Sequence, residues 1–203
     1  MVDLLYDHSG NRKYITERER RLFLRTARKT APRPVYTFCL VLALTGARLS
    51  EVLALTPRHI DVHGRLIVYR TLKKRKKVEY RAVPVPAWLI REVDTVHGIT
   101  AARQDVTRAD VRIWPWCRTT GWTRVKEVMS TAGITGIQGT AKGCRHGFAV
   151  DALVKKVPLV IVQEWLGHAK LETTAIYSKA VATEARTIAN RMWGLGLRFG
   201  LRW

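Results

Sequence analysis

The chain has 203 residues, of which 36 are lysine or arginine and 16 are aspartate or glutamate, giving a formal net charge of +20. Because 47% of the residues are hydrophobic, the chain can bury a core, which excludes a disordered basic tail. So basic a surface repels itself unless a polyanion neutralises it, which favours a nucleic acid partner without choosing between DNA and RNA. The length suits one domain, or one domain with a small appendage.

Several protein classes are disfavoured by local features. The longest apolar run, residues 35–44, is too short to span a bilayer, and the N-terminus lacks the basic and apolar regions of an export signal. The three cysteines, Cys39, Cys117 and Cys144, form an odd and unclustered set, which argues against a disulfide framework and a zinc site. We therefore expect a cytoplasmic protein with no metal and no membrane association.

The first predicted helix carries its own start signal. Residues 1–14 are polar and irregular, and Thr16 with Glu19 three positions later forms the pattern of a capping box. Pro32 and Pro34 end this helix because proline disrupts a helix interior.

Two further helices and one β region follow. The apolar residues 35–43 predict a buried helix, and a shorter helix is expected over residues 50–55. Residues 65–69 and 78–83 are rich in strand formers and flank the charged segment 73–77. We predict an antiparallel hairpin with that segment at its tip.

The rest of the chain is predicted to be helical. Gly133, Pro158 and Gly167 separate the periodic segments. The helices are expected over residues 87–96, 120–132, 145–155, 159–166 and 171–190. The fold class is therefore α+β, mostly helical with a small antiparallel sheet.

Four segments have residue types that suit phosphate chemistry. They are Thr45-Gly46-Ala47-Arg48-Leu49-Ser50-Glu51, the hairpin tip Lys73–Lys77 closing at Arg81, Lys142-Gly143-Cys144-Arg145-His146, and Leu166-Gly167-His168 with Tyr177 nine residues further on. They resemble the T-G-x-R-x-S-E, hairpin-lysine, H-x-x-R-H and L-G-H…Y signatures of the tyrosine recombinases, also called the phage integrase family. One such box is a weak signal, whereas four in order with matching spacing are specific.

The resemblance runs over residues 14–193 and implies a domain plan. It implies a tyrosine recombinase catalytic domain with a three-stranded antiparallel sheet, after an N-terminal extension of residues 1–13. Members of the family usually carry a helical domain before it that clamps the DNA, so we expect either a minimal enzyme or a partner that supplies the clamp. The apolar tail, residues 194–203, corresponds to a segment that often docks into a neighbouring subunit of the family's tetramers on paired DNA sites.

The resemblance also implies a phosphoryl transfer without metal or cofactor. Tyr177 would attack a phosphodiester of double-stranded DNA, forming a 3′-phosphotyrosyl bond and releasing a 5′-hydroxyl. The 5′-hydroxyl of another strand would then attack this bond and reverse the step. Only about one free tyrosine in a thousand is ionised at pH 7, so the site needs cations or a base to activate it.

The other site residues take roles in that reaction. Arg48 and Arg145 would hold the phosphate, because a guanidinium stays charged and offers a fork to two oxygens. His168 would donate a hydrogen bond to a phosphoryl oxygen. Glu51 would orient Arg48 or the histidine, and His146 is expected to play a supporting role.

The lysines leave alternatives open. A hairpin lysine would protonate the leaving 5′-oxygen, and Lys73 is preferred because it lies where the strand meets the tip, although Lys74 and Lys76 remain open. Lys142 stands where the family most often has histidine, and it would either accept the tyrosine proton or contact phosphate. The predicted DNA-binding residues are Lys74, Arg75, Lys76, Lys77 and Arg81.

Competing interpretations remain. The same chemistry serves DNA relaxation by type IB topoisomerases, and a DNA-binding accessory factor could keep the fold without the activity. An RNA-binding role would predict stacking aromatics near the basic strands, but Tyr69 and Tyr80 are explained equally well by strand propensity. Singly, Arg48 would most often be a helix-end ion pair with Glu51, and only the joint occurrence of the segments favours a recombinase.

Overall fold

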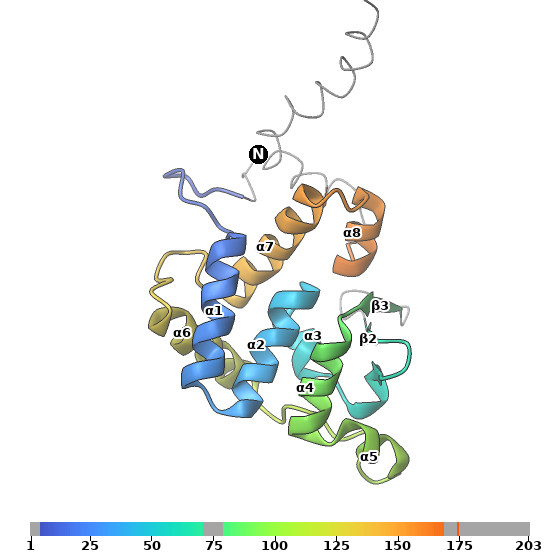
Figure 1. Cartoon of the computed structure of the whole chain (residues 1–203). Helices are drawn as coiled ribbons and strands as arrows, with labels where there is room; N and C mark the ends of the chain where they lie inside the picture. The colour runs from blue at the N-terminus through green and yellow to red at the C-terminus, as the bar shows by residue number, and fades with distance from the viewer. Residues whose placement is uncertain (1–4, 71–78, 169–173, 175–203) are drawn as a thin grey trace, which may run out of the picture.

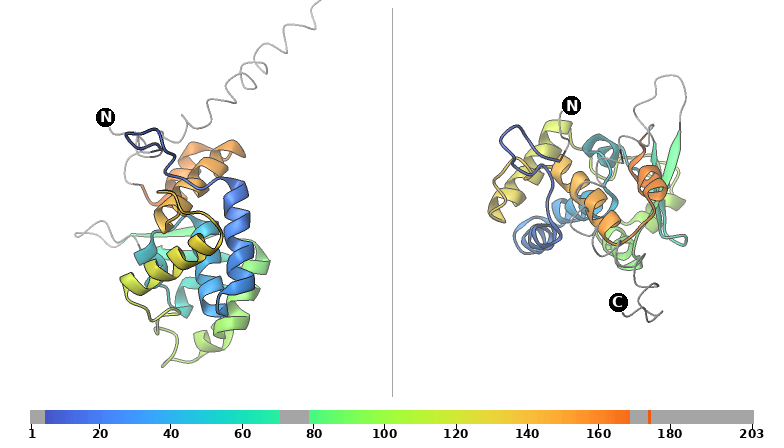
Figure 2. Two further views of the ribbon diagram at one scale, coloured as in Figure 1. Left: turned by 90° about the vertical axis from the view of Figure 1, so that its left-hand side faces the viewer. Right: turned by 90° about the horizontal axis from the view of Figure 1, so that it is seen from above.

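A computed structural model describes residues 5–70, 79–168 and 174 as helices packed around a central helix, with a small sheet on one side (Figure 1). Seen from above, α1 lies on one side of the molecule and the sheet with α8 on the other (Figure 2). The elements are α1 (Glu17–Thr30), α2 (Arg33–Thr45), α3 (Leu49–Leu53), the 3₁₀ turn η1 (Pro57–His59), β1 (Ile60–Asp61), β2 (Leu66–Arg70), β3 (Tyr80–Pro84), α4 (Ala87–His97), α5 (Ile99–Gln104), α6 (Arg118–Thr131), α7 (Ala141–Val154) and α8 (Leu159–Leu166).

The start of α1 agrees with its predicted signal. The Thr16 hydroxyl accepts a hydrogen bond from the Glu19 amide at 3.2 Å, and the Glu19 carboxylate accepts one from the Thr16 amide at 2.7 Å. The helix ends at Thr30, and Pro32 is the N-cap of α2. Pro32 therefore lies between the two helices, as predicted, whereas Pro34 lies in the first turn of α2.

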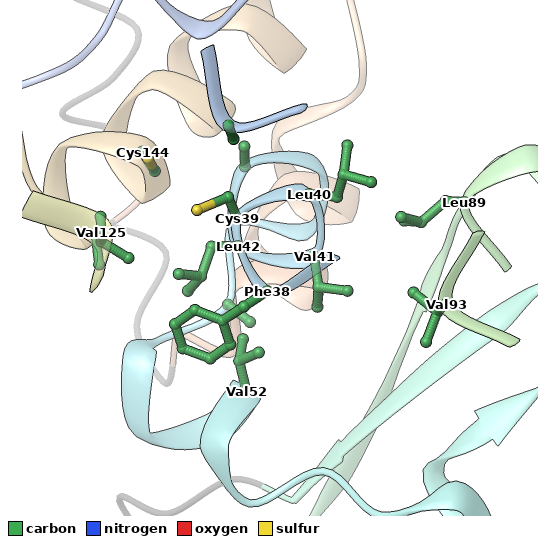
Figure 3. Close-up of a cluster of buried hydrophobic side chains, with 14 of the residues drawn as sticks. Phe38, Cys39, Leu40, Val41, Leu42, Val52, Leu89, Val93, Val125 and Cys144 are labelled. Atoms are coloured by element: carbon green, nitrogen blue, oxygen red, sulfur yellow. The ribbon is translucent and has the colours of Figure 1, made fainter. Parts of the chain in front are cut away.

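Helix α2 forms the centre of the core. Its apolar residues are buried on almost every side, and the core around it includes residues of α4, α6 and α7 (Figure 3). Phe38 and Leu42 are fully enclosed, and burying such a side chain contributes roughly 1.5–3 kcal/mol. The predicted buried helix is confirmed and extends two residues further at each end.

The sheet has the order β1-β2-β3, and both strand pairs are antiparallel. Ile67 pairs with Val83 and Tyr69 pairs with Arg81, and all four side chains are buried. The predicted hairpin is confirmed, with strand bounds shifted by one or two residues. Its tip, residues 71–78, lies outside the described residues.

Two helix predictions need correction. Helix α7 begins at Ala141 instead of residue 145, because the Thr140 hydroxyl caps it by accepting a hydrogen bond from the Gly143 amide at 3.0 Å. The short helix α5 was not predicted. The predicted helix over residues 171–190 and the tail over 194–203 lie outside the described residues, apart from Thr174.

The N-terminal segment packs on the far end of the core. Leu5 is buried in a second apolar cluster with Ala149, Val162 and Leu166 of α7 and α8. The boundaries of the extension, the catalytic domain and the tail remain predictions. Within the described ranges, no helix is long and apolar enough to cross a membrane.

Candidate functional site

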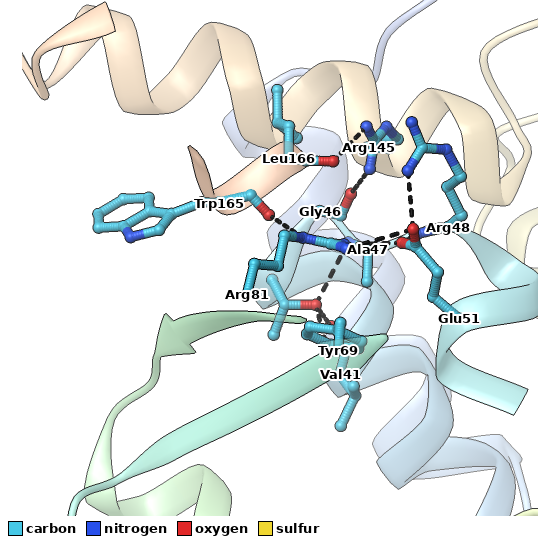
Figure 4. A network of polar contacts seen from close by, with 11 residues as sticks. Val41, Gly46, Ala47, Arg48, Glu51, Tyr69, Arg81, Arg145, Trp165 and Leu166 are labelled. Carbon is cyan, nitrogen blue, oxygen red and sulfur yellow. Dashed lines mark hydrogen bonds and ion pairs between the residues drawn. The ribbon is translucent and has the colours of Figure 1, made fainter. Parts of the chain in front are cut away.

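Four segments meet at one junction: the end of α2, the start of α3, strand β3 and the end of α8, with α7 beside them (Figure 4). Gly46 caps α2 in the left-handed region at φ 63°. A Cβ atom there would lie 2.5 Å from Cδ1 of Phe148 and 3.1 Å from Cδ2 of Leu166. Glycine is therefore required for α2 to turn this close to α7 and α8.

Arg145 ties two helix ends together from α7. It is 7% exposed, and its Nη1 and Nη2 atoms donate to the carbonyl oxygens of Gly46 at 2.8 Å and Leu166 at 2.7 Å. The C-terminal ends of helices carry partial negative charge, which favours a cation at this place. The guanidinium of Arg145 is thus held in a fixed position.

Arg48 lies at the start of α3 and is oriented by Glu51. The Glu51 carboxylate accepts hydrogen bonds from the backbone amide and from Nη1 of Arg48, both at 2.7 Å. The Arg48 side chain is 25% exposed, whereas that of Glu51 is fully buried. The guanidinium is therefore fixed at one nitrogen and still reaches the surface.

Arg81 does not occupy the place that we expected for a DNA-binding residue. Its side chain is only 4% exposed, and its Nη1 and Nη2 atoms donate to the Glu51 carboxylate at 3.2 and 2.7 Å. Its Nε donates to the Trp165 carbonyl at 2.8 Å, and the guanidinium lies over the Tyr69 ring. The interpretation of Arg81 as a DNA contact is therefore corrected, because its donors are directed at protein acceptors inside the fold.

The two arginines determine the charge state of Glu51. Burial alone would raise the pKa of this carboxyl group, but the hydrogen bonds and charges of Arg81 and Arg48 outweigh burial and lower it. Glu51 is therefore ionised at neutral pH, with one cation on each side of it.

His168 directly follows the end of α8. Gly167 caps that helix with φ 63°, and the His168 amide donates to the Gln163 carbonyl at 3.2 Å. The Nδ1 atom of His168 lies 2.9 Å from the hydroxyl of Thr174, which is buried. This contact sets the orientation of the imidazole ring.

His146 and Lys142 lie on α7 near Arg145. His146 is buried, and burial together with the positive charges of Lys142 and Arg145 lowers its pKa to about 4, so it is neutral at pH 7. Lys142 is exposed in the first turn of the helix. The predicted residues Lys73, Lys74, Arg75, Lys76, Lys77 and Tyr177 lie outside the described residues.

The sequence profile of the phage integrase family matches residues 13–184. The chain belongs to this family. It is 32% identical over 183 residues to tyrosine recombinase XerA of Thermococcus onnurineus, covering 86% of this chain and 60% of that protein. It is 35% identical over 150 residues to tyrosine recombinase XerD of Yersinia pestis, covering 71% and 48%. The chain thus spans roughly half of the length of these curated relatives.

Solved structures of family members show the same fold. The crystal structure of XerA recombinase aligns with a TM-score of 0.68 at 22% identity, covering 86% of this chain and 62% of that one. The catalytic domain of bacteriophage HP1 integrase aligns with a TM-score of 0.62 at 19% identity, covering 87% and 95%. The predicted family and the predicted fold class are both confirmed.

Proposed function

We propose that this chain is the strand-cutting part of a site-specific DNA recombinase, which breaks and rejoins DNA through a 3′-phosphotyrosyl bond to Tyr177. The family membership supports the reaction class. The observation that carries the proposal is the junction where Arg145 on α7 donates to the carbonyls of Gly46, two residues before Arg48, and Leu166, two residues before His168. Two fixed cations and an oriented imidazole suit a phosphodiester whose charge shifts during attack.

The reaction exchanges one phosphate ester for another. The Tyr177 oxygen forms a bond to phosphorus, and the bond from phosphorus to the 5′-oxygen breaks. Lys73 gives a proton to that leaving oxygen, and the tyrosine gives its own proton to solvent water during attack. A 5′-hydroxyl from another strand reverses the step, so no cofactor is consumed.

The arginines supply the electrostatic part of this mechanism. Because Arg145 is already held by two carbonyl oxygens, it does not reorganise when the phosphate arrives. Arg48 contacts the second phosphoryl oxygen, and His168 donates a hydrogen bond. Lys142 is assigned to a phosphate contact, because it is exposed in the first turn of α7, three residues before Arg145.

The proposed partner is double-stranded DNA, in the compartment that holds it. A net charge of +20 suits the phosphate backbone. The related XerH recombinase was solved bound to its difH substrate before and after cleavage, with TM-scores to this chain of 0.69 and 0.71. We propose that the working unit is a homotetramer on paired sites.

Trapping the covalent intermediate tests the proposal. The protein is incubated with nicked duplexes from its own replicon, so that the freed fragment escapes, and it is then digested with trypsin and nuclease. We expect a nucleotide adduct on peptide Leu171–Lys179 that is absent in Tyr177→Phe.

Other outcomes would point to the competing functions. Tight, salt-sensitive DNA binding without an adduct would support the accessory-factor interpretation. Relaxation of supercoiled plasmids that lack a paired site would support a topoisomerase. Failure to bind DNA at modest salt would contradict the proposal.

A further inference from the structure

The contact between Arg48 and Glu51 creates an electrostatic problem. An arginine that binds phosphate must present a positive charge, yet a buried carboxylate lies 2.7 Å from its Nη1 atom. A carboxylate in contact with a guanidinium cancels most of the field that a third charge feels. Glu51 alone would orient Arg48 and at the same time weaken its attraction for a phosphate.

Arg81 is a second cation on the same carboxylate. Its Nη2 atom lies 2.7 Å from Oε2 of Glu51, while Nη1 of Arg48 lies 2.7 Å from Oε1. The side chains of Arg81 and Glu51 are almost completely buried, and that of Arg48 is partly exposed. The three groups together carry one positive charge, and its exposed end is at Arg48.

We propose that Arg81 is a positioning residue for strand cleavage, which neutralises Glu51 so that Glu51 can orient Arg48 without cancelling its charge. This inference rests on the proposed function, because it assigns Arg48 to the scissile phosphate. Arg81 itself does not touch DNA.

Arg81 also links the sheet to the end of α8. It lies on β3, donates from Nε to the Trp165 carbonyl, and lies over the ring of Tyr69. A Cβ atom on Gly167 would come within 3.1 Å of its guanidinium, so the turn before His168 packs directly on Arg81. The same side chain therefore fixes the residue that precedes the imidazole.

The surroundings of Glu51 offer few other groups that would titrate near neutral pH. Besides the two arginines, Glu51 borders a cavity of about 480 Å³ whose charged or titratable lining residues are Arg58, His59, Arg70, Tyr80 and Asp110. Arg58 is paired with Asp110 at 2.8 Å, and burial lowers the pKa of His59. Removing Arg81 therefore makes Glu51 the group whose protonation changes most.

The test compares single-turnover cleavage of a nicked duplex by four proteins at saturating concentration, between about pH 6 and pH 8.5. They are wild type, Arg81→Met, Arg81→Lys and Arg81→Met with Glu51→Gln. Arg81→Met is expected to cleave about 10- to 100-fold more slowly per bound complex. Its rate relative to wild type should rise toward low pH, because Glu51 then becomes protonated and no longer cancels Arg48.

The other variants separate charge from geometry. The double variant should recover most of the lost rate and lose the pH dependence, because the amide that replaces the Glu51 carboxylate carries no charge. Arg81→Lys should be intermediate, since it keeps the charge but not the fork. The control is Arg20→Met, which removes a partly buried ion pair with Asp151 at 2.7 Å. It should keep the wild-type rate per folded molecule.

Two results would overturn the proposal. One is a folded Arg81→Met that cleaves at the wild-type rate. The other is a lower cleavage rate that does not change with pH and is just as low in the double variant. If wild type itself forms no adduct, the proposed function fails. Amide hydrogen exchange then still tests whether Arg81 holds Arg48, through Glu51, and the turn before His168 in place. The amides of Arg48, Gly167 and His168 should then exchange at least about tenfold faster in Arg81→Met or Arg81→Lys than in Arg20→Met, and equal rates would contradict it.

Discussion

The two halves of the core around α2 are held together in different ways. Along its length, α2 buries apolar side chains such as Phe38 and Leu42 against its neighbours. At its C-terminal end, the buried groups include the charged side chains of Glu51, Arg81 and Arg145. Apolar packing is non-directional and tolerates substitutions that conserve volume, whereas each bond at the junction depends on one donor and one acceptor. Stability and chemistry should therefore respond differently to mutations in these two regions.

Among changes at the C-terminal end of α2, Arg145→Lys should lower the cleavage rate most. A lysine cannot reach the carbonyls of Gly46 and Leu166 together while it also contacts a phosphate. We expect single-turnover cleavage to fall by about 10²–10³-fold, as for loss of a fixed donor to a transition state. A reduction of less than about threefold, measured with DNA binding intact, would place the phosphate elsewhere.

Gly46→Ala should show how tightly the junction is packed. The left-handed conformation costs an L-residue about 1–2 kcal/mol, and the contact with Phe148 adds about 1–3 kcal/mol of overpacking. Gly133 is the matched control, because it has φ 71° and nothing within 4 Å of an added Cβ. Urea unfolding should show a clearly larger loss for Gly46→Ala, and equal losses would mean that the junction can relax.

Leu42→Ala should produce the opposite pattern to Arg145→Lys. Removing a fully buried leucine from α2 costs about 2–5 kcal/mol, because a cavity remains. The cleavage rate per folded molecule should stay within about twofold of wild type, since the fixed donors are unchanged. If the rate falls as far as for Arg145→Lys, the separation between the two regions is wrong.

The smallest predicted effect is a pH dependence of stability from His97. Its ring lies 2.8 Å from the Thr37 hydroxyl, and burial lowers its pKa to about 4. The unfolded chain binds this proton near pH 6.5, so the stabilisation is fully present above about pH 6.5 and is lost as the pH falls toward 4. His146 acts in the same direction.

His97→Gln tests this contribution by removing one titrating group. The urea midpoint of this variant should fall less between about pH 7.5 and pH 5 than that of wild type. His63→Gln, at an exposed turn residue, should follow wild type. Parallel pH profiles for all three proteins would rule out His97 as a contributor.

Elements whose signals lie within a short stretch of sequence could be predicted from the sequence alone. The capping pair Thr16 and Glu19, the apolar run of α2 and the hairpin are all encoded within a few positions. The start of α7 was missed because Gly143 in its first turn weakens the helical pattern.

The junction shows what local patterns cannot encode. Strand alternation places Arg81 on the buried face, whereas its charge predicts an exposed position. Its buried partner, Glu51, lies thirty positions earlier in the chain, so the sequence near Arg81 does not reveal it. The acceptors for Arg145 are backbone carbonyls, which have no signature in the sequence. The residue types of the site could therefore be predicted, but not the contacts that hold them.

The central claim is that Arg48 and Arg145 act on the charge of the scissile phosphate. The direct measurement uses a duplex whose cut site carries a methylphosphonate, in which a methyl group replaces one charged oxygen. The cleavage rates of wild type, Arg48→Met and Arg145→Met are compared on this duplex and on the ordinary one. We predict that each variant loses at least about tenfold less activity on the methylphosphonate, because less charge needs to be balanced. Equal losses on both duplexes would show that the arginines act by holding the fold, which would contradict the account.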